Sequence, residues 1–211
     1  MTPRRARPAR GLATLAAFTL ALALSPAAPA AAGPPPGRLP PTRTEPPFGA
    51  PLTREMARLA AAIASDDPAR ALAVFFPEAA YVRMKTGEIP DPARDYADRL
   101  VAFLRLDVAA YHAVLDAGRP ARFVRVAADP AFAQWIAPGA CENSLGYWHE
   151  PGVRLVFAHD HRFVSVGVDS LISWRGAWYV VHLGPNPRPR DVGTVLSYSL
   201  GPGRPGPPGG C

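Results

Sequence analysis

Two side chains in the last third of the sequence, Asp169 and His182, have the types needed for an acid–base pair. Residues 162–174 alternate in polarity as a β-strand does, and Asp169 shares a face with small residues. If that face lines a pocket, burial raises the pKa of the carboxyl group and makes it a usable general base. His182 lies on the next expected strand and would exchange protons with it. The alternative is a solvated surface carboxylate beside a histidine bonded to backbone.

A second group of functional side chains lies in the segment 141–149, within a long loop that we expect between residues 129 and 150. Loops on a rigid scaffold often carry binding residues. Tyr147 and Trp148 would form an aromatic wall for a ligand, and neighbouring polar groups would orient it. The expected ligand-binding residues are Glu142, Asn143, Tyr147, Trp148 and His149. The alternative is that the aromatic rings only anchor the loop to the core.

The other reactive residue types are paired histidines and two cysteines. His159 and His161 have the spacing of two metal ligands on one side of a strand, but a third ligand would have to come from elsewhere, such as His149 or His182. The alternative is a polar hairpin tip. We therefore expect no metal site and no cofactor, an expectation that the absence of nucleotide-binding, serine-hydrolase and zinc-protease motifs supports. Cys141 and Cys211 could form a disulfide in an oxidising compartment; free thiols and intermolecular pairing are the alternatives.

The first 32 residues have the order of a secretory signal peptide. Four arginines precede an uncharged Ala/Leu-rich run from Gly11 to Leu24, and small residues follow up to Ala32. We expect cleavage after Ala32 and a secreted or extracellular product. The apolar run is shorter than the ~20 residues that span a bilayer, so no stable membrane span is expected after cleavage. An uncleaved anchor is the alternative.

The basic character of the chain belongs mostly to this leader. The formal net charge is +6, and it falls to +2 when the four arginines of the leader are removed. Nucleic-acid binding proteins carry a basic stripe or patch, and none follows residue 32. We therefore expect no nucleic-acid partner.

Proline and glycine delimit one domain between residues 52 and 200. Residues 33–51 contain eight prolines and predict a disordered linker, and residues 201–211 predict a disordered Gly/Pro tail. Polarity periods inside the domain predict three helices, a short strand and four later strands. The helices are expected over 53–65, 68–76 and 92–117, and the strands over 81–85, 122–127, 153–158, 162–174 and 177–183. This order predicts an α+β fold with three helices packed on a curved, mostly antiparallel, cone-like sheet.

The element order resembles the nuclear-transport-factor-2-like (SnoaL-like) fold, and the hairpin at 173–183 (SWRGAWYVVHL) resembles the closing hairpin of that superfamily. The chain is also similar to uncharacterised secreted proteins of high-GC bacteria. The resemblance implies a cone whose last strand borders a cavity, but such folds host isomerases, dehydratases, hydrolases and binding domains. We expect an exported binding or interaction module of the cell envelope, whose partner is a small molecule or an envelope component. A small cavity enzyme using Asp169 and His182, and a purely structural envelope protein, are the alternatives.

Overall fold

The computed structural model describes residues 41–116 and 121–206. The expected signal peptide (1–32), the first part of the expected linker and Cys211 lie outside these residues. Within the described ranges, no helix has both the length and the apolar character needed to cross a bilayer.

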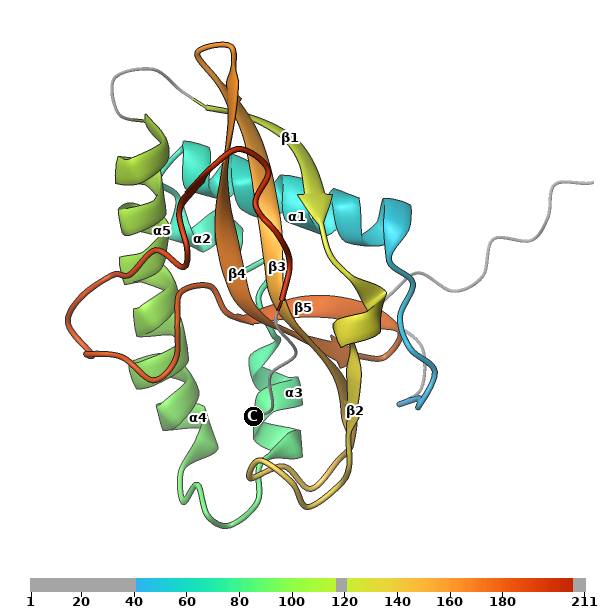
Figure 1. The fold of residues 1–211 in the computed structure, drawn as a ribbon. Helices are drawn as coiled ribbons and strands as arrows, with labels where there is room; N and C mark the ends of the chain where they lie inside the picture. Colours follow the sequence, from blue (N-terminus) through green and yellow to red (C-terminus); the bar gives the residue numbers. More distant parts are fainter. Residues whose placement is uncertain (1–40, 117–120, 207–211) are drawn as a thin grey trace, which may run out of the picture. The chain divides into compact units, whose positions relative to one another are not determined.

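A six-stranded antiparallel sheet organises the described part of the domain (Figure 1). The long hairpin of β3 (Tyr147–His159) and β4 (Arg162–Trp174) is its centre. The other strands are β1 (Arg122–Ala127), β2 (Gln134–Ile136), β5 (Ala177–His182) and β6 (Ser199–Leu200). β1 and β2 both pair with β3, whereas β5 and β6 both pair with β4. The expected α+β class with an antiparallel sheet is confirmed.

The helices precede the sheet in the chain. They are α1 (Gly49–Ala64), α2 (Pro68–Ala71), α3 (Glu78–Met84), α4 (Pro92–Asp95), the π-helical turn η1 (Tyr96–Val101) and α5 (Ala102–Asp116), and a 3₁₀ turn η2 (Pro130–Phe132) lies between β1 and β2. Asp67 and Asp91 cap α2 and α4 as their Asp-Pro sequences predict, each accepting a backbone hydrogen bond at 3.0 Å from the residue three positions later. The expected long helix is the continuous run of α4, η1 and α5.

Residues 81–84 belong to helix α3 and Lys85 is its extended C-cap residue, so the expected strand over 81–85 is wrong. Pro77 occupies the N-cap position of α3, and Glu78 places a negative charge in its first turn. Tyr81 and Met84 are both buried, and their spacing of three residues is that of one helical face. The β-forming residues in this segment are therefore held in a helix by its start signal and by the burial of this face.

The start of α1 also differs from expectation. The helix begins at Gly49 rather than after Thr53, and the Thr53 hydroxyl donates to the carbonyl of Gly49 at 2.8 Å from inside the first turn. The chain before α1 docks on the sheet through indole donors: Trp148 Nε1 donates to the Arg43 carbonyl at 2.8 Å, and Trp178 Nε1 to the Pro46 carbonyl at 3.1 Å. The expected disordered linker therefore does not extend to residue 51.

The core lies between α1, α5 and one face of the β3–β4 hairpin. α1 packs against β1, β5 and α5. Its fully buried side chains include Met56, Leu59 and Ile63, and β4 contributes Val166 and Val168 to the same core. Burial of such side chains contributes about 1.5–3 kcal/mol each relative to exposure.

The chain after β5 covers the other face of the hairpin, where Figure 1 shows it crossing in front of β3 and β4. The side chain of Leu196 lies directly on Gly167, where an added Cβ would come within 2.7 Å of it. Further on, the Gly206 N–H donates to the Gly152 carbonyl at 3.1 Å, and Gly203 lies against Arg154. Residues 201–206 are thus packed on the sheet, and the expected disordered tail is wrong for this part.

Asp107 and Tyr111 on α5 hold this C-terminal segment. The buried carboxylate of Asp107 accepts from the backbone N–H groups of Gly184 at 2.9 Å and Thr194 at 3.0 Å, and it pairs with Arg188. The Tyr111 hydroxyl accepts from the Leu196 N–H at 3.0 Å, and its single proton lies between the carbonyl oxygens of Gly167 at 2.7 Å and Leu183 at 2.9 Å. Two side chains one turn apart on α5 therefore fix the path of the chain after the sheet.

Candidate functional site

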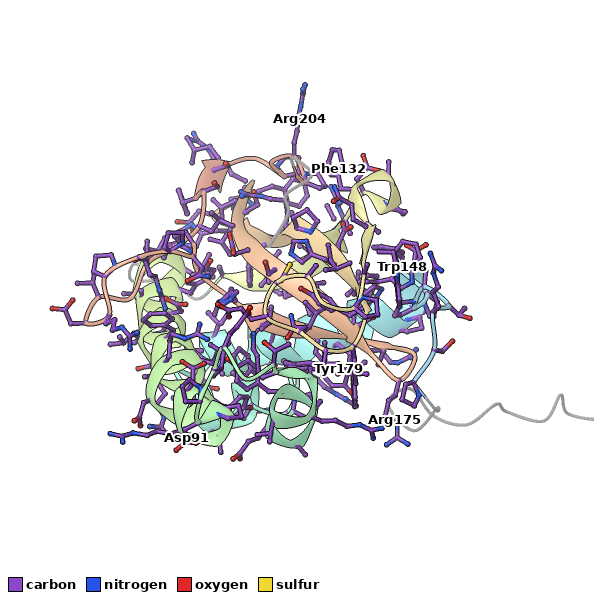
Figure 2. The ribbon with its side chains drawn as sticks, turned by 90° about the horizontal axis from the view of Figure 1, so that it is seen from below. Asp91, Phe132, Trp148, Arg175, Tyr179 and Arg204 are labelled. Atoms are coloured by element: carbon purple, nitrogen blue, oxygen red, sulfur yellow. The ribbon has the colours of Figure 1, made fainter. Side chains whose placement is uncertain are left out.

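A pocket of about 350 Å³ opens between the lower half of the sheet and the helices α3 and η1. Its walls come from β3, β4, β5, α3, η1 and the loop 137–146. In the view from below, this loop crosses the end of the molecule in front of the sheet (Figure 2). The volume lies in the range of small-molecule sites.

The pocket brings together most of the residues that the sequence singled out. Asp169 and His182 both line it, and so do Cys141, Glu142, Asn143, Tyr147 and His149. Trp148 does not line it. Figure 2 shows this residue beside the chain that precedes α1, and the centre of its ring lies 6.0 Å from that of Trp135. The expected loop is wrong at this point, because residues 147–149 already belong to β3 and their alternation turns Trp148 away from its neighbours.

A bulge in β5 shapes the floor of the pocket, because Ser170 pairs with His182 and Leu171 with Val180, which leaves Val181 as an extra residue on β5. The β4–β5 ladder shifts register between Ser170 and Leu171. Asp169 and Ser170 both line the pocket although they are consecutive, and Ile172 lines it with them. The extra residue changes which side chains of β5 share a face, and the consecutive residues Val181 and His182 both line the pocket.

Ser170 connects Asp169 to His149. The hydroxyl group of Ser170 lies 2.9 Å from His149 Nε2 and donates to Asp169 Oδ2 at 3.5 Å. Within the described residues no hydrogen bond joins Asp169 to His182, whose Nε2 instead lies 3.5 Å from the side-chain nitrogen of Asn186. The histidine that is linked to the carboxylate is thus His149, and the expected direct pairing with His182 is not seen.

Burial sets the protonation states in the pocket. It raises the pKa of Asp169 to about 6, against a smaller opposing effect of the hydrogen bond from Ser170. Burial lowers the pKa of His182 to about 4, and the nearby positive charges of Arg99 and Arg188 act in the same direction. At neutral pH the carboxyl group of Asp169 is ionised and the His182 ring is neutral, so both can accept a proton.

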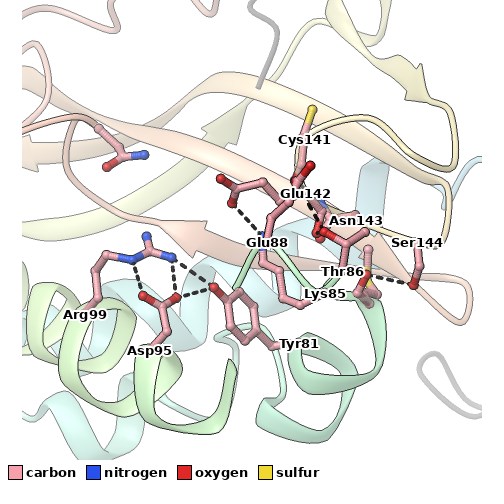
Figure 3. A network of polar contacts seen from close by, with 12 residues as sticks. Tyr81, Lys85, Thr86, Glu88, Asp95, Arg99, Cys141, Glu142, Asn143 and Ser144 are labelled. Carbon is pink, nitrogen blue, oxygen red and sulfur yellow. Dashed lines mark hydrogen bonds and ion pairs between the residues drawn. The ribbon is translucent and has the colours of Figure 1, made fainter. Parts of the chain in front are cut away.

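A helical network forms the opposite wall (Figure 3). Arg99 donates to Asp95 at 2.8 Å and to the Tyr81 hydroxyl at 2.9 Å, and Tyr81 in turn donates to Asp95. The bonds from Arg99 lower the pKa of Asp95, and burial raises the pKa of Tyr81. The sequence interpretation missed these residues because nothing in their local pattern shows that two helices bring them together.

Lys85 enters the pocket from the end of α3. Its Nζ lies 3.7 Å from Glu142 Oε2 and 5.0 Å from the centre of the Tyr81 ring. Only 10% of its side chain is exposed, and burial lowers its pKa. Lys85 is the only lysine in the sequence, where every other basic side chain besides histidine is arginine. A single lysine among arginines is the one feature of the sequence that points to this position.

The loop that carries Cys141 and Glu142 is fastened to the end of α3. Ser144 donates to the Met84 carbonyl through both its N–H, at 2.6 Å, and its hydroxyl, at 2.9 Å, and Thr86 N–H donates to the Glu142 carbonyl at 3.0 Å. Cys141 and Glu142 have φ angles of 57° and 59°, a left-handed conformation that non-glycine residues adopt at a cost. These contacts hold Glu142 against Lys85.

The disulfide and metal expectations concern other parts of the chain. Cys141 is disulfide-bonded. Its expected partner Cys211 lies outside the described residues, so that pairing stays a prediction. His159 and His161 lie at the turn of the β3–β4 hairpin. In the part of the chain that the structure describes, no group of three or more His, Cys, Asp or Glu side chains could hold a metal ion.

The chain was also compared with known proteins. No family model matches it, and no curated protein or solved structure matches it at a significant level. The geometry of the pocket is therefore the guide to its chemistry.

Proposed function

We propose that this protein is an exported binding protein that holds a small polar organic molecule in the pocket described above. The observation that carries the proposal is a cavity of about 350 Å³ whose polar lining is assembled from separate segments of the chain. Asp169 supports it further, because this half-buried carboxylate lines the cavity and forms no ion pair with any described residue. A ligand that offers a hydrogen-bond donor or a positive charge would compensate it.

Export and fold family remain part of this proposal. The order of charged, apolar and small residues in the leader supports secretion. A curved antiparallel sheet that encloses a pocket together with helices supports a cone of the nuclear-transport-factor-2-like kind. Recognition of a large envelope component through exposed aromatic rings has less support, because Tyr147 is buried and the Trp148 indole N–H is bonded to the N-terminal arm.

Filling the pocket is expected to abolish ligand binding. Val181 lines the cavity on β5, and a tryptophan there would occupy ligand volume. The protein is screened against a library of sugars, amines, amino acids and carboxylic acids. Compounds that raise the unfolding temperature of the wild type should not raise that of Val181→Trp. At a concentration of 100 Kd a ligand raises the free energy of unfolding by about 2.7 kcal/mol, which thermal unfolding measures easily.

The matched control is Val124→Trp, which adds the same ring to an exposed position of β1. It should retain every ligand-induced shift. Equal shifts in Val181→Trp, or a library without any stabilising compound, would contradict binding in this pocket.

Acid–base catalysis is the second candidate, and the link from Asp169 through Ser170 to His149 favours it. A suitable probe is 5-nitrobenzisoxazole, whose ring opens when a base removes the proton on its carbon atom C3. The rate should rise with pH through about 6 as Asp169 ionises and level off above, since only the carboxylate can take the proton. Asp169→Asn should lower the plateau at least tenfold. Asp98→Asn, which alters an exposed carboxylate, should not. A rate without a step near pH 6 would leave binding as the function.

A further inference from the structure

Lys85 differs chemically from every other cationic side chain that the pocket contains. Arg99 stays charged at all ordinary pH values and is bonded to Asp95, and His182 is neutral at neutral pH. A lysine can lose its proton, and its neutral amine is a nucleophile. In this sequence that property occurs at one side chain alone, since there is a single lysine.

The position of Lys85 suits a nucleophile. The side chain is 10% exposed, whereas its partner Glu142 is 51% exposed, so the amine is the inner member of the pair. Its backbone is held at the end of α3 by a hydrogen bond to the Tyr81 carbonyl at 3.1 Å and by a bridge to Asn143. Figure 3 shows the side chain extending from this anchored point towards Glu142. The amine therefore borders the cavity from a fixed backbone position.

An ion pair alone would not require a lysine here. A guanidinium group pairs with a carboxylate through two parallel hydrogen bonds, and the chain uses arginine in that way against Asp95. A partly exposed Lys–Glu pair contributes little to stability, because water screens the attraction between its charges. Burial has the largest effect on the pKa of Lys85 and lowers it, which favours the uncharged amine, whereas the charge of Glu142 acts to raise this pKa.

We propose that Lys85 binds an aldehyde or ketone in the pocket covalently and reversibly, as an imine. This inference rests on the proposed function, because it assigns a chemical class to the molecule that the pocket would hold. It adds to that function a bond between the protein and its ligand.

The step balances without an oxidant or a reductant. Glu142, 3.7 Å from the ammonium group, accepts its proton and frees the lone pair of Nζ. The lone pair forms a bond to the carbonyl carbon, and the π electrons move to the carbonyl oxygen, which takes up a proton. The nitrogen then loses one of its two protons, and the hydroxyl group takes up a proton and leaves as water while the nitrogen forms a double bond to carbon. Loss of the second nitrogen proton to Glu142 gives the neutral imine. Amine and carbonyl compound thus give imine and one water molecule.

Trapping by reduction tests the inference. The full chain is incubated at pH 7 with glyoxylate, pyruvate, glycolaldehyde or acetone together with sodium cyanoborohydride, and the adduct is located by peptide mass mapping. With at least one of these probes, Lys85 should be modified at least tenfold faster than Nα-acetyl-lysine amide under the same conditions. Because the only other primary amine is the chain's N-terminal group, the two sites are readily separated in the map.

Lys85→Arg is the matched control, since it keeps the positive charge and cannot form the adduct. It should unfold at the wild-type temperature and show modification at the N-terminal amine only. Glu142→Gln should retain the adduct but form it several-fold more slowly, because the proton acceptor is lost. Modification of Lys85 no faster than that of acetyl-lysine amide with every probe would overturn the inference.

The outcome is separable from that of the proposed function. Suppose that compounds stabilise the wild type but not Val181→Trp, and that trapping at Lys85 is slow. The pocket would then be a non-covalent binding site, and imine formation at Lys85 would be excluded. Slow trapping without any stabilising compound would contradict both proposals.

Discussion

Replacing Asp107 with alanine is expected to lower the free energy of unfolding by about 3–5 kcal/mol. The side chain is 1% exposed and accepts the N–H groups of Gly184 and Thr194. Its ion-pair partner Arg188 is 3% exposed and lies over the Phe103 ring at 4.3 Å. Alanine would leave a buried cation without its counterion and two backbone donors without an acceptor, and both cost more than the pair itself contributes.

Urea denaturation at pH 7 measures this loss. Asp98→Ala on the same helical run is the matched control: its partner Arg94 is exposed, so the change should stay below about 0.5 kcal/mol. The double variant Asp107→Ala/Arg188→Met should recover part of the loss, since it removes the uncompensated charge. A stability of Asp107→Ala within 1 kcal/mol of wild type would show that the segment after β5 is held by other contacts.

Glu150→Gln is expected to stabilise the protein by about 4 kcal/mol at pH 8 and to have little effect near pH 4. Glu150 is fully buried, and neither carboxylate oxygen has a hydrogen-bond partner among the described residues. Burial raises its pKa to about 8, and the nearby carboxylates of Asp129 and Glu45 act in the same direction. The folded state therefore holds a proton that the unfolded chain releases near pH 4.5.

The sign of the pH dependence follows from this difference. A carboxyl group whose pKa is raised in the folded state makes its full contribution to the free energy of unfolding below the pKa of the unfolded chain. This contribution is lost as the pH rises towards 8. Above pH 6.5 the remaining titration of Asp169 (pKa about 6 when folded) and of His182 (pKa about 4 when folded and 6.5 when unfolded) changes the stability by only a few tenths of a kcal/mol, with opposite signs. Between pH 6.5 and 8 the wild type should therefore lose about 1.5 kcal/mol through Glu150.

Unfolding free energies across this interval decide the matter. Glu150→Gln should be nearly independent of pH there, whereas Glu55→Gln, which changes a carboxyl group outside the core, should keep the wild-type slope. An unchanged slope in Glu150→Gln would mean that this carboxyl group titrates normally.

The starts of α2 and α4, the tight turn between β4 and β5 and the long helix could be predicted from the sequence, because each depends on residues that are close together in the chain. The Asp-Pro caps start α2 and α4, and Gly176, with a φ of 83°, completes the tight turn between β4 and β5. In the long helix expected over 92–117, the apolar residues at helical spacing, from Tyr96 and Leu100 to Tyr111 and Leu115, are buried. Capping and amphipathic spacing act within a few residues, so a single sequence displays them.

The pocket depends on features that no local signal displays. The bulge at Val181 is set by the pairing of β5 with β4, and the consecutive residues Val181 and His182 both line the pocket. Lys85 and Arg99 reach the site only because α3 and η1 pack opposite the sheet. The sequence thus identified the sheet side of the site and the 141–149 segment, and it missed the helical side.

The π-helical turn η1 has a consequence for how this chain tolerates change in length. Arg99 belongs to that turn, whereas Asp107 and Tyr111 lie on the α-helix that continues from it. In an α-helix each residue advances the direction of the side chains by about 100°, so deleting one residue from the turn would rotate one half of the rod against the other by that angle. Either Arg99 would then leave the pocket, or Asp107 and Tyr111 would lose their hydrogen bonds to the segment after β5. The additional residue of the π-helical turn thus fixes the rotation of the pocket residues relative to the α5 residues that hold the C-terminal segment. The length of this turn is therefore constrained more tightly than its sequence.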